Sequence, residues 1–403
     1  MLILLTLLII GASVPHVAKS EPSPGSGDRD QELFKLQAKI EEMGKKVTNL
    51  ENLIRRLTDY QHLSRYKLPN QLDLCGQPVP LNHWELRERL EREFFLMLGD
   101  EGQTLLWLKR SRRYFPLIEK KLKEQGLPDD LKYVTIVESG LRATAYSSAG
   151  ASGYWQFISS TGQRYGMDSN DWLDERRDIE KATDGAIKYL RDLYNLFRDW
   201  PLALAAYNAG EGRILKEMKA QRVSSYYELV LPQETERYVF RVVIAKLILS
   251  HPEKYGYHLD PEDYYQPIEF DTVFVGVPEG RLDLGVIADA SGSYYREIKL
   301  LNPELKETSL PRGNYMIRIP KGAKRRFEEN FRAGQGTFVL SSEKSVQDLK
   351  KKSERIEYTV KKGDTLFTIA QRFSVYVESL IEWNNLQKGK YIRPGEVLVI
   401  LQP

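Results

Sequence analysis

The sequence predicts an α+β multidomain protein with an N-terminal coiled-coil helix, a mainly α-helical central domain and two small βααβ modules at the C-terminus. Three observations support this fold class. A heptad pattern runs from Leu33 to Leu57, and helical periodicity dominates residues 84–255. Beyond Asp260, aromatic and β-branched residues alternate as they do in strands. A length of 403 residues allows two or three domains of about 150 residues each.

Composition excludes several classes of function. Lys and Arg number 59 against 56 Asp and Glu, and a formal net charge of +3 argues against a dedicated nucleic-acid binder. One cysteine excludes an internal disulfide framework and a Cys-rich zinc site. Five scattered histidines also disfavour a His-based metal site. We therefore expect neither a metal nor a cofactor.

Residues 1–20 are predicted to form a signal peptide. The apolar run Met1–Val14 is shorter than the roughly 20 residues that span a bilayer, but it fits the apolar core of a secretory signal. Ala18 and Ser20 are suitably small for cleavage before Glu21. The alternative is an uncleaved anchor, because no Lys or Arg precedes the run. Since no cysteine follows it, we expect a protein of the periplasm or cell envelope, without a lipid anchor and without a transmembrane span in its mature form.

Residues 21–30 are rich in Pro, Gly and Ser and predict a linker, and residues 31–62 predict a coiled coil. Apolar residues fill every a and d position of four heptads: Leu33, Leu36, Ile40, Met43, Val47, Leu50, Ile54 and Leu57. β-Branched residues at a and Leu at d favour a parallel two-stranded assembly, so a homodimer through residues 33–57 is expected. The alternative is an amphipathic helix folded against its own chain.

The remaining chain divides by pattern into five parts. Residues 63–127 predict a basic helical extension, 128–258 the central helical domain, 265–322 a first small module, 323–355 a charged linker and 356–402 a second small module. A weak internal repeat relates the two modules, because Leu284–Ala288 resembles Leu366–Ala370 and Ile298–Pro303 resembles Leu380–Asn385.

Glu138 is the candidate general acid. The segment 130–138 predicts a helix that Pro128 begins and Gly140 ends, so Glu138 lies in the last turn, after an apolar run. Apolar surroundings and the partial negative charge of a helix C-terminus both raise the pKa of a carboxyl group, as a general acid at neutral pH requires. The helix position alone, however, favours a Glu side chain that simply reaches water.

Three motifs downstream change this interpretation. A loop of small residues, Ser147–Ile158, contains Gly-Tyr-Trp-Gln; Ala-Tyr-Asn-Ala-Gly follows at 206–210; and Glu234–Tyr238 comes last. Small residues allow close approach by a bulky ligand, and an aromatic residue beside Gln suits a sugar. With Glu138-Ser139, and in this order, the motifs resemble those of lytic transglycosylases with the soluble-transglycosylase, goose-lysozyme-like fold. The segment Tyr358–Leu366, with Trp-Asn at 383–384, resembles a LysM module, and the resemblance covers residues 68–403.

The resemblance implies a lysozyme-like catalytic domain over residues 128–258, with peptidoglycan glycan strands as its partner. Glu138 would be the sole catalytic acid and base, cleaving the bond between N-acetylmuramic acid and N-acetylglucosamine without water and leaving 1,6-anhydromuramoyl ends. Substrate-assisted enzymes of this kind need no second carboxylate. The resemblance gives the role of positioning the sugar and Glu138 to Ser139, Gln156, Tyr207, Asn208 and Tyr238. Helix packing and capping are the alternative roles of these five residues.

For the C-terminal module the resemblance implies binding to the cell wall. Gly363, Asp364 and Thr365 would form the turn after the first strand. Beside the loop that starts at Ile392, this turn would leave a shallow groove for N-acetyl groups. A plain turn without a ligand is the alternative.

The chain departs from the family at three points. Phe240 stands where the family often has proline, and the lipid-attachment cysteine is missing. The module at 265–322 lacks a Gly-Asp-Thr motif, which argues against sugar binding by this module.

Two rival functions remain open. A muramidase on the same fold would use water and a second carboxylate, for which Asp168, Asp171 and Asp174 are candidates. A non-catalytic peptidoglycan-binding scaffold would dimerise through its coiled coil.

Overall fold

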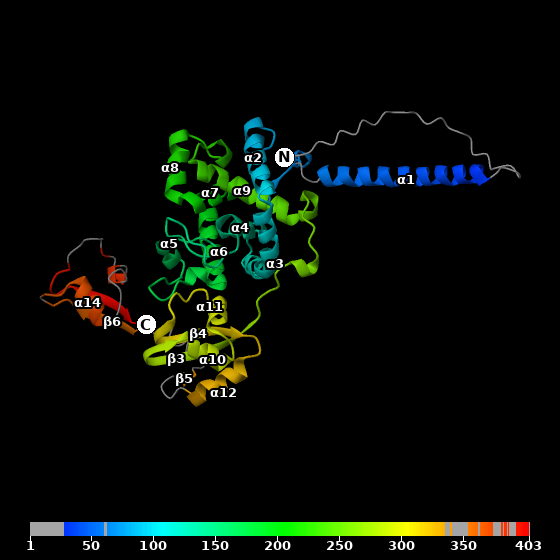
Figure 1. Ribbon diagram of the computed structural model, residues 1–403. Helices are drawn as coiled ribbons and strands as arrows, with labels where there is room; N and C mark the ends of the chain where they lie inside the picture. The colour runs from blue at the N-terminus through cyan, green and yellow to red at the C-terminus, as the bar shows by residue number, and fades with distance from the viewer. Residues whose placement is uncertain are drawn as a thin grey trace. The chain divides into compact units, whose positions relative to one another are not determined.

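The computed structural model describes residues 28–59, 63–334, 339–340, 354–361, 363–373, 380–381, 383–384, 386 and 392–402. The predicted signal peptide, most of the linker at 21–30 and residues 341–353 of the charged linker lie outside the described residues. Two units divide the chain, Met1–Lys67 and Leu68–Pro403. The described part is mostly helical with small antiparallel sheets, in agreement with the predicted α+β class (Figure 1).

The first unit consists mainly of one long helix, α1 (Asp28–Asp59). The described side chains of its heptad stripe, from Leu33 to Ile54, are between 52% and 66% exposed. Among the described residues, no helix combines the length and the apolar character that a membrane crossing needs.

Helices of the second unit surround α7, which is apolar on every side. Because Trp200, Leu202 and residues 203–206 are all buried, α7 packs at once against α6, α8 and α9, as expected for a central helix. A short hairpin, β1 (Asp73–Leu74) and β2 (Gln77–Pro78), precedes these helices. The helices are α2 (Trp84–Gly99), α3 (Glu101–Glu124), α4 (Val134–Ser139), α5 (Ser159–Arg164), α6 (Ile179–Phe197), α7 (Trp200–Ala209), α8 (Glu211–Gln221) and α9 (Gln233–Ser250).

Local caps fix the ends of the helices that carry the site. The predicted helix over 130–138 is divided into a 3-10 turn, η2 (Asp129–Tyr133), and α4, which ends where Gly140 adopts a left-handed conformation. The Asp178 carboxylate caps α6 by accepting the N–H groups of Glu180 and Lys181, both at 2.9 Å. Asp199 caps α7 in the same way through the N–H of Leu202.

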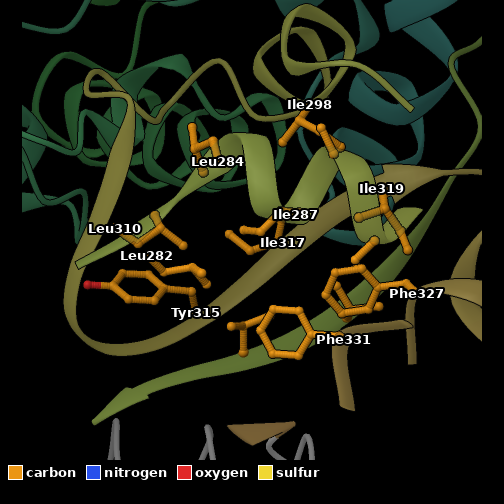
Figure 2. Packing of buried hydrophobic residues seen from close by; sticks show 14 of the residues in the cluster. Leu282, Leu284, Ile287, Ile298, Leu310, Tyr315, Ile317, Ile319, Phe327 and Phe331 are labelled. Atoms are coloured by element: carbon orange, nitrogen blue, oxygen red, sulfur yellow. The ribbon is translucent and has the colours of Figure 1, made fainter. Parts of the chain in front are cut away.

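The next part of the unit is a βααβ module with its own core. Strands β3 (Phe270–Asp283) and β4 (Ser309–Pro320) pair antiparallel, and α10 (Leu284–Ser291) and α11 (Tyr295–Leu301) connect them. Alternate residues of each strand point into a cluster that Figure 2 shows, with Ile287 and Ile298 from the helices facing Ile317 and Ile319 from β4. The short strand β5 (Val339–Leu340) pairs with β3 on its other edge.

The beginning of the expected charged linker is folded instead. Helix α12 (Lys324–Gly334) belongs to the module, because Phe327 and Phe331 are 0% and 1% exposed and lie in its core (Figure 2). The two aromatic residues are four apart, so they lie on one face of the helix while the charged residues occupy the other. The prediction of a linker from residue 323 is wrong over these residues, since the high charge hid a narrow apolar face.

The C-terminal module repeats the plan of the first. Strands β6 (Glu354–Thr359) and β7 (Val397–Gln402) pair antiparallel, and α14 (Leu366–Phe373) follows β6. The predicted internal repeat has a physical counterpart in two asparagines. Asn302 bonds the carbonyl of Ile298 and both backbone groups of Arg318, and Asn384 makes the same three bonds to Leu380 and Val399.

Candidate active site

Glu138 lies half-buried in the last turn of α4, and its carboxylate accepts a hydrogen bond from the hydroxyl of Tyr238 on α9 at 2.5 Å. Burial raises the pKa of Glu138 from 4.5 to about 7. The bond from Tyr238 and the charge of Arg241 lower this pKa, while the charge of Glu234 raises it. Since burial dominates, Glu138 is protonated in a large fraction of molecules near neutral pH, as a general acid requires.

Two tyrosines line the same site from α7 and α9. The hydroxyl of Tyr207 donates to the carbonyl of Trp155 at 2.7 Å, so α7 is tied to the small-residue loop. Burial raises the pKa of both Tyr207 and Tyr238 well above 10, and the nearby charge of Glu138 adds to the effect. Both phenols are therefore neutral donors at any physiological pH.

The side chains of Ser139 and Gln156 donate hydrogen bonds to backbone carbonyls of the chain itself. Ser139 is 4% exposed, and its hydroxyl lies 2.8 Å from the carbonyl of Tyr154 and 3.1 Å from that of Thr135. The side-chain amide of Gln156 donates to the carbonyls of Ala145 and Gly153, at 3.0 Å and 2.8 Å. Ser139 thus holds α4 against the loop, and Gln156 fixes the fold of the loop itself.

Asn208, at the end of α7, accepts a hydrogen bond from Thr235 of α9 at 2.9 Å. This bond joins the second and third downstream motifs, which the sequence separates by about 25 residues. Phe240, two residues beyond Tyr238, is 1% exposed, and the guanidinium of Arg89 lies 4.8 Å from its ring centroid. A side chain in place of the family's proline is therefore accommodated within the helical core.

The small-residue loop rests on a buried ion pair. Arg176, 4% exposed, donates to the Asp174 carboxylate at 2.7 Å and 2.9 Å, and through its other nitrogen to the carbonyls of Gly150 and Phe157, both at 2.9 Å. Gly153 has a φ of +83°, and a Cβ there would lie 1.8 Å from the carbonyl oxygen of Arg176. Only glycine fits at this position, which explains the Gly-Tyr-Trp-Gln motif.

Helix α3 covers the other side of the turn that carries Glu138. Arg110 donates to the carbonyl of Gly140 at 3.0 Å, and the indole of Trp107 packs over the position that a Gly140 Cβ would occupy. Further along the helix, Arg113 donates to the carbonyl of Gln266 at 2.9 Å. These basic residues of α3 bind the chain itself, in agreement with a structural role for the basic extension.

The Gly-Asp-Thr turn of the C-terminal module is held by its own side chains. Gly363 has a φ of +95°, and Asp364 accepts bonds from the Tyr358 hydroxyl at 2.6 Å and the Lys361 N–H at 2.8 Å. These bonds hold the pKa of Asp364 below its usual value. Thr365 and Thr368 exchange backbone-to-hydroxyl bonds and cap α14. Ile392 is half-buried and packs against the module core.

Sequence reasoning assigned no role to several residues that support this site, although Glu234 and Thr235 lie within the third downstream motif. Glu234 and Arg241 act on the pKa of Glu138, Thr235 orients Asn208, and Arg176 carries the loop. Helical spacing gave a signal for the first two, because Glu234 and Arg241 lie four residues before and three after Tyr238 on α9. No local pattern points to Arg176. Within the described residues, no group of three or more His, Cys, Asp and Glu side chains could hold a metal ion.

Three family matches cover most of the second unit. The transglycosylase SLT domain matches residues 115–230, the LysM-like domain of lytic transglycosylase MltD matches 269–335, and the LysM domain matches 358–401. Membrane-bound lytic murein transglycosylase D of Escherichia coli K12 is 33% identical over 297 residues, which is 72% of this chain and 64% of the relative. The chain thus spans just under two thirds of this relative's length.

Other relatives match smaller parts. Membrane-bound lytic murein transglycosylase C of Haemophilus ducreyi is 30% identical over 159 residues, covering 36% of this chain and 42% of the relative. The crystal structure of the 70 kDa soluble lytic transglycosylase of Escherichia coli covers 45% of this chain and 32% of its own, at 19% identity and a TM-score of 0.33. In order along the chain, its segments thus match a transglycosylase SLT domain, a LysM-like domain and a LysM domain, and the chain is similar to membrane-bound lytic murein transglycosylase D.

Proposed function

We propose that the protein is a lytic transglycosylase of peptidoglycan, which cleaves the bond between N-acetylmuramic acid and N-acetylglucosamine without water. One observation carries this proposal. Glu138 is a half-buried carboxyl whose pKa is raised to about 7, and a neutral tyrosine holds it where the four motifs converge. The similarity to relatives whose names describe this activity supports the same conclusion.

In the proposed reaction Glu138 acts twice. Protonated Glu138 gives its proton to the glycosidic oxygen as the bond to C1 of the muramic acid breaks. The N-acetyl group of that sugar stabilises the positive charge on C1, in place of a second carboxylate. Ionised Glu138 then takes the proton of the C6 hydroxyl as its oxygen attacks C1. The 1,6-anhydro ring closes and Glu138 ends protonated, ready for the next cycle.

The surroundings of Asp174, one of the three candidate second carboxylates, argue against it as the base of a muramidase. The Asp174 side chain is 2% exposed and pairs with Arg176 at 2.7 Å and Arg177 at 3.4 Å, so it cannot activate water. A different carboxylate, that of Glu234 at the start of α9, acts electrostatically on Glu138 and raises its pKa. If water were the acceptor, Glu234 would therefore be its base.

Mass spectrometry of muropeptides released from purified sacculi tests the proposed reaction. Anhydromuramoyl ends, 18 mass units lighter than reducing ends because water is not added, are the expected products. Reducing muramic ends as the main product would establish hydrolysis instead, and Glu234→Gln would then be the variant to compare with Glu138→Gln.

We further propose that residues 356–402 bind glycan strands and act at the cell wall. The support is the match to the LysM domain and the turn at residues 363–365. Shortly before this turn, both backbone groups of Val360 are bonded to Gly395 and Glu396, in the loop that starts at Ile392. Because Asp364 and Thr365 use their side chains to shape this turn, the backbone of the turn is the surface offered to N-acetyl groups.

For α1 we propose a parallel two-stranded coiled coil between two copies of the chain. Its support is the exposed stripe of a and d residues, which an apolar partner helix would bury. Light scattering on the secreted chain is expected to give twice the monomer mass. Replacing Ile40 and Val47 by Asp should give the monomer mass, whereas a monomeric wild-type chain would refute the dimer.

A further inference from the structure

The LysM-like module pairs with the helical domain through backbone hydrogen bonds. Leu173, in the loop before α6, forms an isolated antiparallel bridge with Leu305 of the module. Beside this bridge, the N–H of Asp174 donates to the carbonyl of Glu304 at 2.8 Å. Leu173 also packs against the module core. Such pairing fixes the register of the two surfaces, which a flexible tether between domains would not do.

A further backbone bond and a ring contact extend this contact to the loop after Asn302. The N–H of Lys306 donates to the carbonyl of Trp172 at 2.8 Å, and the Trp172 ring meets Tyr315 edge-on at 5.4 Å. Since Asn302 and Asn384 make equivalent bonds, the loop after Asn302 corresponds to the loop after Asn384 in the C-terminal module. In the LysM-like module, the residues that follow Asn302 therefore contact the helical domain through both backbone and side-chain groups.

Buried charges reinforce the contact. Arg318 of β4, with a side chain 13% exposed, pairs with Asp178 of the helical domain and lies 3.3 Å from Glu304. Asp178 and Glu304 are themselves 7% and 11% exposed, so all three charges are largely removed from water. A buried pair of this kind is weak evidence for stability, but it fixes orientation, because each partner left alone is costly.

One line of contacts leads from Arg318 to the active site. Asp178 caps α6 with the carboxylate that Arg318 contacts. One turn into α6, the Thr183 hydroxyl accepts the indole N–H of Trp155 at 3.0 Å. The Trp155 carbonyl in turn accepts a hydrogen bond from the hydroxyl of Tyr207. The nearby charge of Glu138 helps to raise the pKa of Tyr207.

A second line leads to the same loop. The backbone of Asp174 is bonded to the module, and its carboxylate orients Arg176. Arg176 holds the carbonyls of Gly150 and Phe157, at either side of the Gly-Tyr-Trp-Gln motif. Both lines therefore join the module to the loop at 150–157, one through a side-chain pair and one through the backbone.

We propose that Arg318 is a positioning residue for the active site, and that the LysM-like module supports the loop at 150–157. Arg318 acts through Asp178 and α6, and it touches no substrate. The kinetic readout of this proposal rests on the proposed transglycosylase activity. The structural readout, order in the loop at 150–157, does not.

The test compares Arg318→Ala and Arg318→Lys with the full-length protein. We expect kcat on soluble glycan strands to fall by about tenfold to a hundredfold in Arg318→Ala, with KM little changed, because misplaced groups cost rate more than binding. Amide hydrogen exchange should accelerate in residues 150–157 but not in α7. Arg318→Lys keeps the charge between the two carboxylates and loses the fork, so it should show a smaller change of the same kind and serves if the alanine variant unfolds.

Arg281→Ala is the matched control, since Arg281 is an exposed arginine of the same module that bonds only to Ser309 among the described residues. It should leave kcat and loop exchange at wild-type values. A double-mutant cycle with Asp178→Asn, which keeps an oxygen to cap α6, should give a combined loss smaller than the product of the single losses.

Wild-type kcat and unchanged exchange at residues 150–157 in both Arg318 variants would overturn the proposal. Inactivity of the wild-type protein on glycan strands would instead refute the proposed function, while the exchange data would still decide the role of Arg318.

Discussion

At the scale of the residue, burial converts an ordinary glutamate into an acid suited to neutral pH. The last turn of α4 places Glu138 after an apolar segment, and α9 supplies the hydroxyl of Tyr238. This bond acts against the rise in pKa, yet the value remains about 7. The desolvation of one carboxyl therefore outweighs its best hydrogen bond, and this balance sets the pH range in which the proposed reaction runs.

Replacing Glu138 by Gln is expected to reduce glycan cleavage by at least about a thousandfold, because an amide of the same shape has no proton to give. Release of soluble muropeptides from sacculi measures it, and sacculus binding should be retained. Glu279→Gln, an exposed site on β3, is the matched control and should cleave normally. Cleavage by Glu138→Gln near the wild-type rate would remove this residue from the mechanism.

The wild-type rate should fall as the pH rises through about 7, because the first step needs protonated Glu138. The same pKa has a consequence for stability. Its folded value lies above 4.5, so the folded state holds a proton that the unfolded state releases; this contribution is complete below about pH 4.5 and is lost as the pH rises through 7.

Glu138→Gln should therefore stabilise the protein at pH 8, by about 1–3 kcal/mol, and change little at pH 5. Urea unfolding at the two pH values measures the difference. Equal effects of the substitution at pH 5 and pH 8 would show that the folded state does not raise the pKa of Glu138.

At the scale of the element, the loop at 150–157 depends on contacts between backbone segments. Gly153 lies against the carbonyl of Arg176. The Arg176 side chain, paired with the buried Asp174, donates to the carbonyl of Phe157 in the loop. The loop contributes Trp155 to α6 and α7 through two hydrogen bonds. Its shape is therefore set by close approach, and a side chain at the wrong position would push the motif away from Glu138.

Gly153→Ala should reduce activity about a hundredfold or more and destabilise the fold by several kcal/mol, because the added carbon would lie 1.8 Å from a backbone oxygen. Gly166→Ala separates this clash from the cost of the backbone conformation. Gly166 has a similar φ, +86° against +83°, but no atom lies within 4 Å of its Cβ position. It should cost about 1 kcal/mol and leave activity intact. Thermal unfolding and turnover are measured for both variants. If Gly153→Ala and Gly166→Ala lost equal stability and equal activity, backbone conformation alone would explain the losses.

At the scale of the whole molecule, the two modules share a plan, but we propose different uses for them. They share the asparagine that ties the second helix to the last strand, and each has a separate apolar core. The first is extended by α12 and bonded to the helical domain, whereas the second retains a Gly-Asp-Thr turn. The two proposals thus assign a supporting module and a glycan-binding module to one repeated plan.

Deleting residues 354–403 is expected to weaken retention on sacculi while leaving the helical domain folded. The C-terminal module has its own core, and tethering a weak glycan binder raises the local concentration of substrate. Turnover of intact sacculi should fall more than turnover of short soluble strands. Pull-down with sacculi compares the two proteins. Equal retention would mean that the catalytic domain holds the polymer without help.

The sequence determined the features that depend on neighbouring residues. Heptad spacing predicted helix α1, the position before Gly140 predicted a glutamate in a last helical turn, and the paired repeats predicted two related modules. Glu138, Tyr207, Asn208 and Tyr238 were predicted from motifs that each lie within a few residues. Periodicity, capping and turn chemistry act over such distances, and they can therefore be read along the chain.

Only the tertiary structure decided which distant residues hold these motifs in place. Arg176 supports a loop about 20 residues away, Arg318 reaches Asp178 across 140 residues, and α12 joins a core although its composition is mostly charged. Asp174, a candidate base by sequence, is buried in an ion pair. Each of these outcomes depends on which surfaces meet when water is excluded, and burial is a property of the packed chain that no local spacing records.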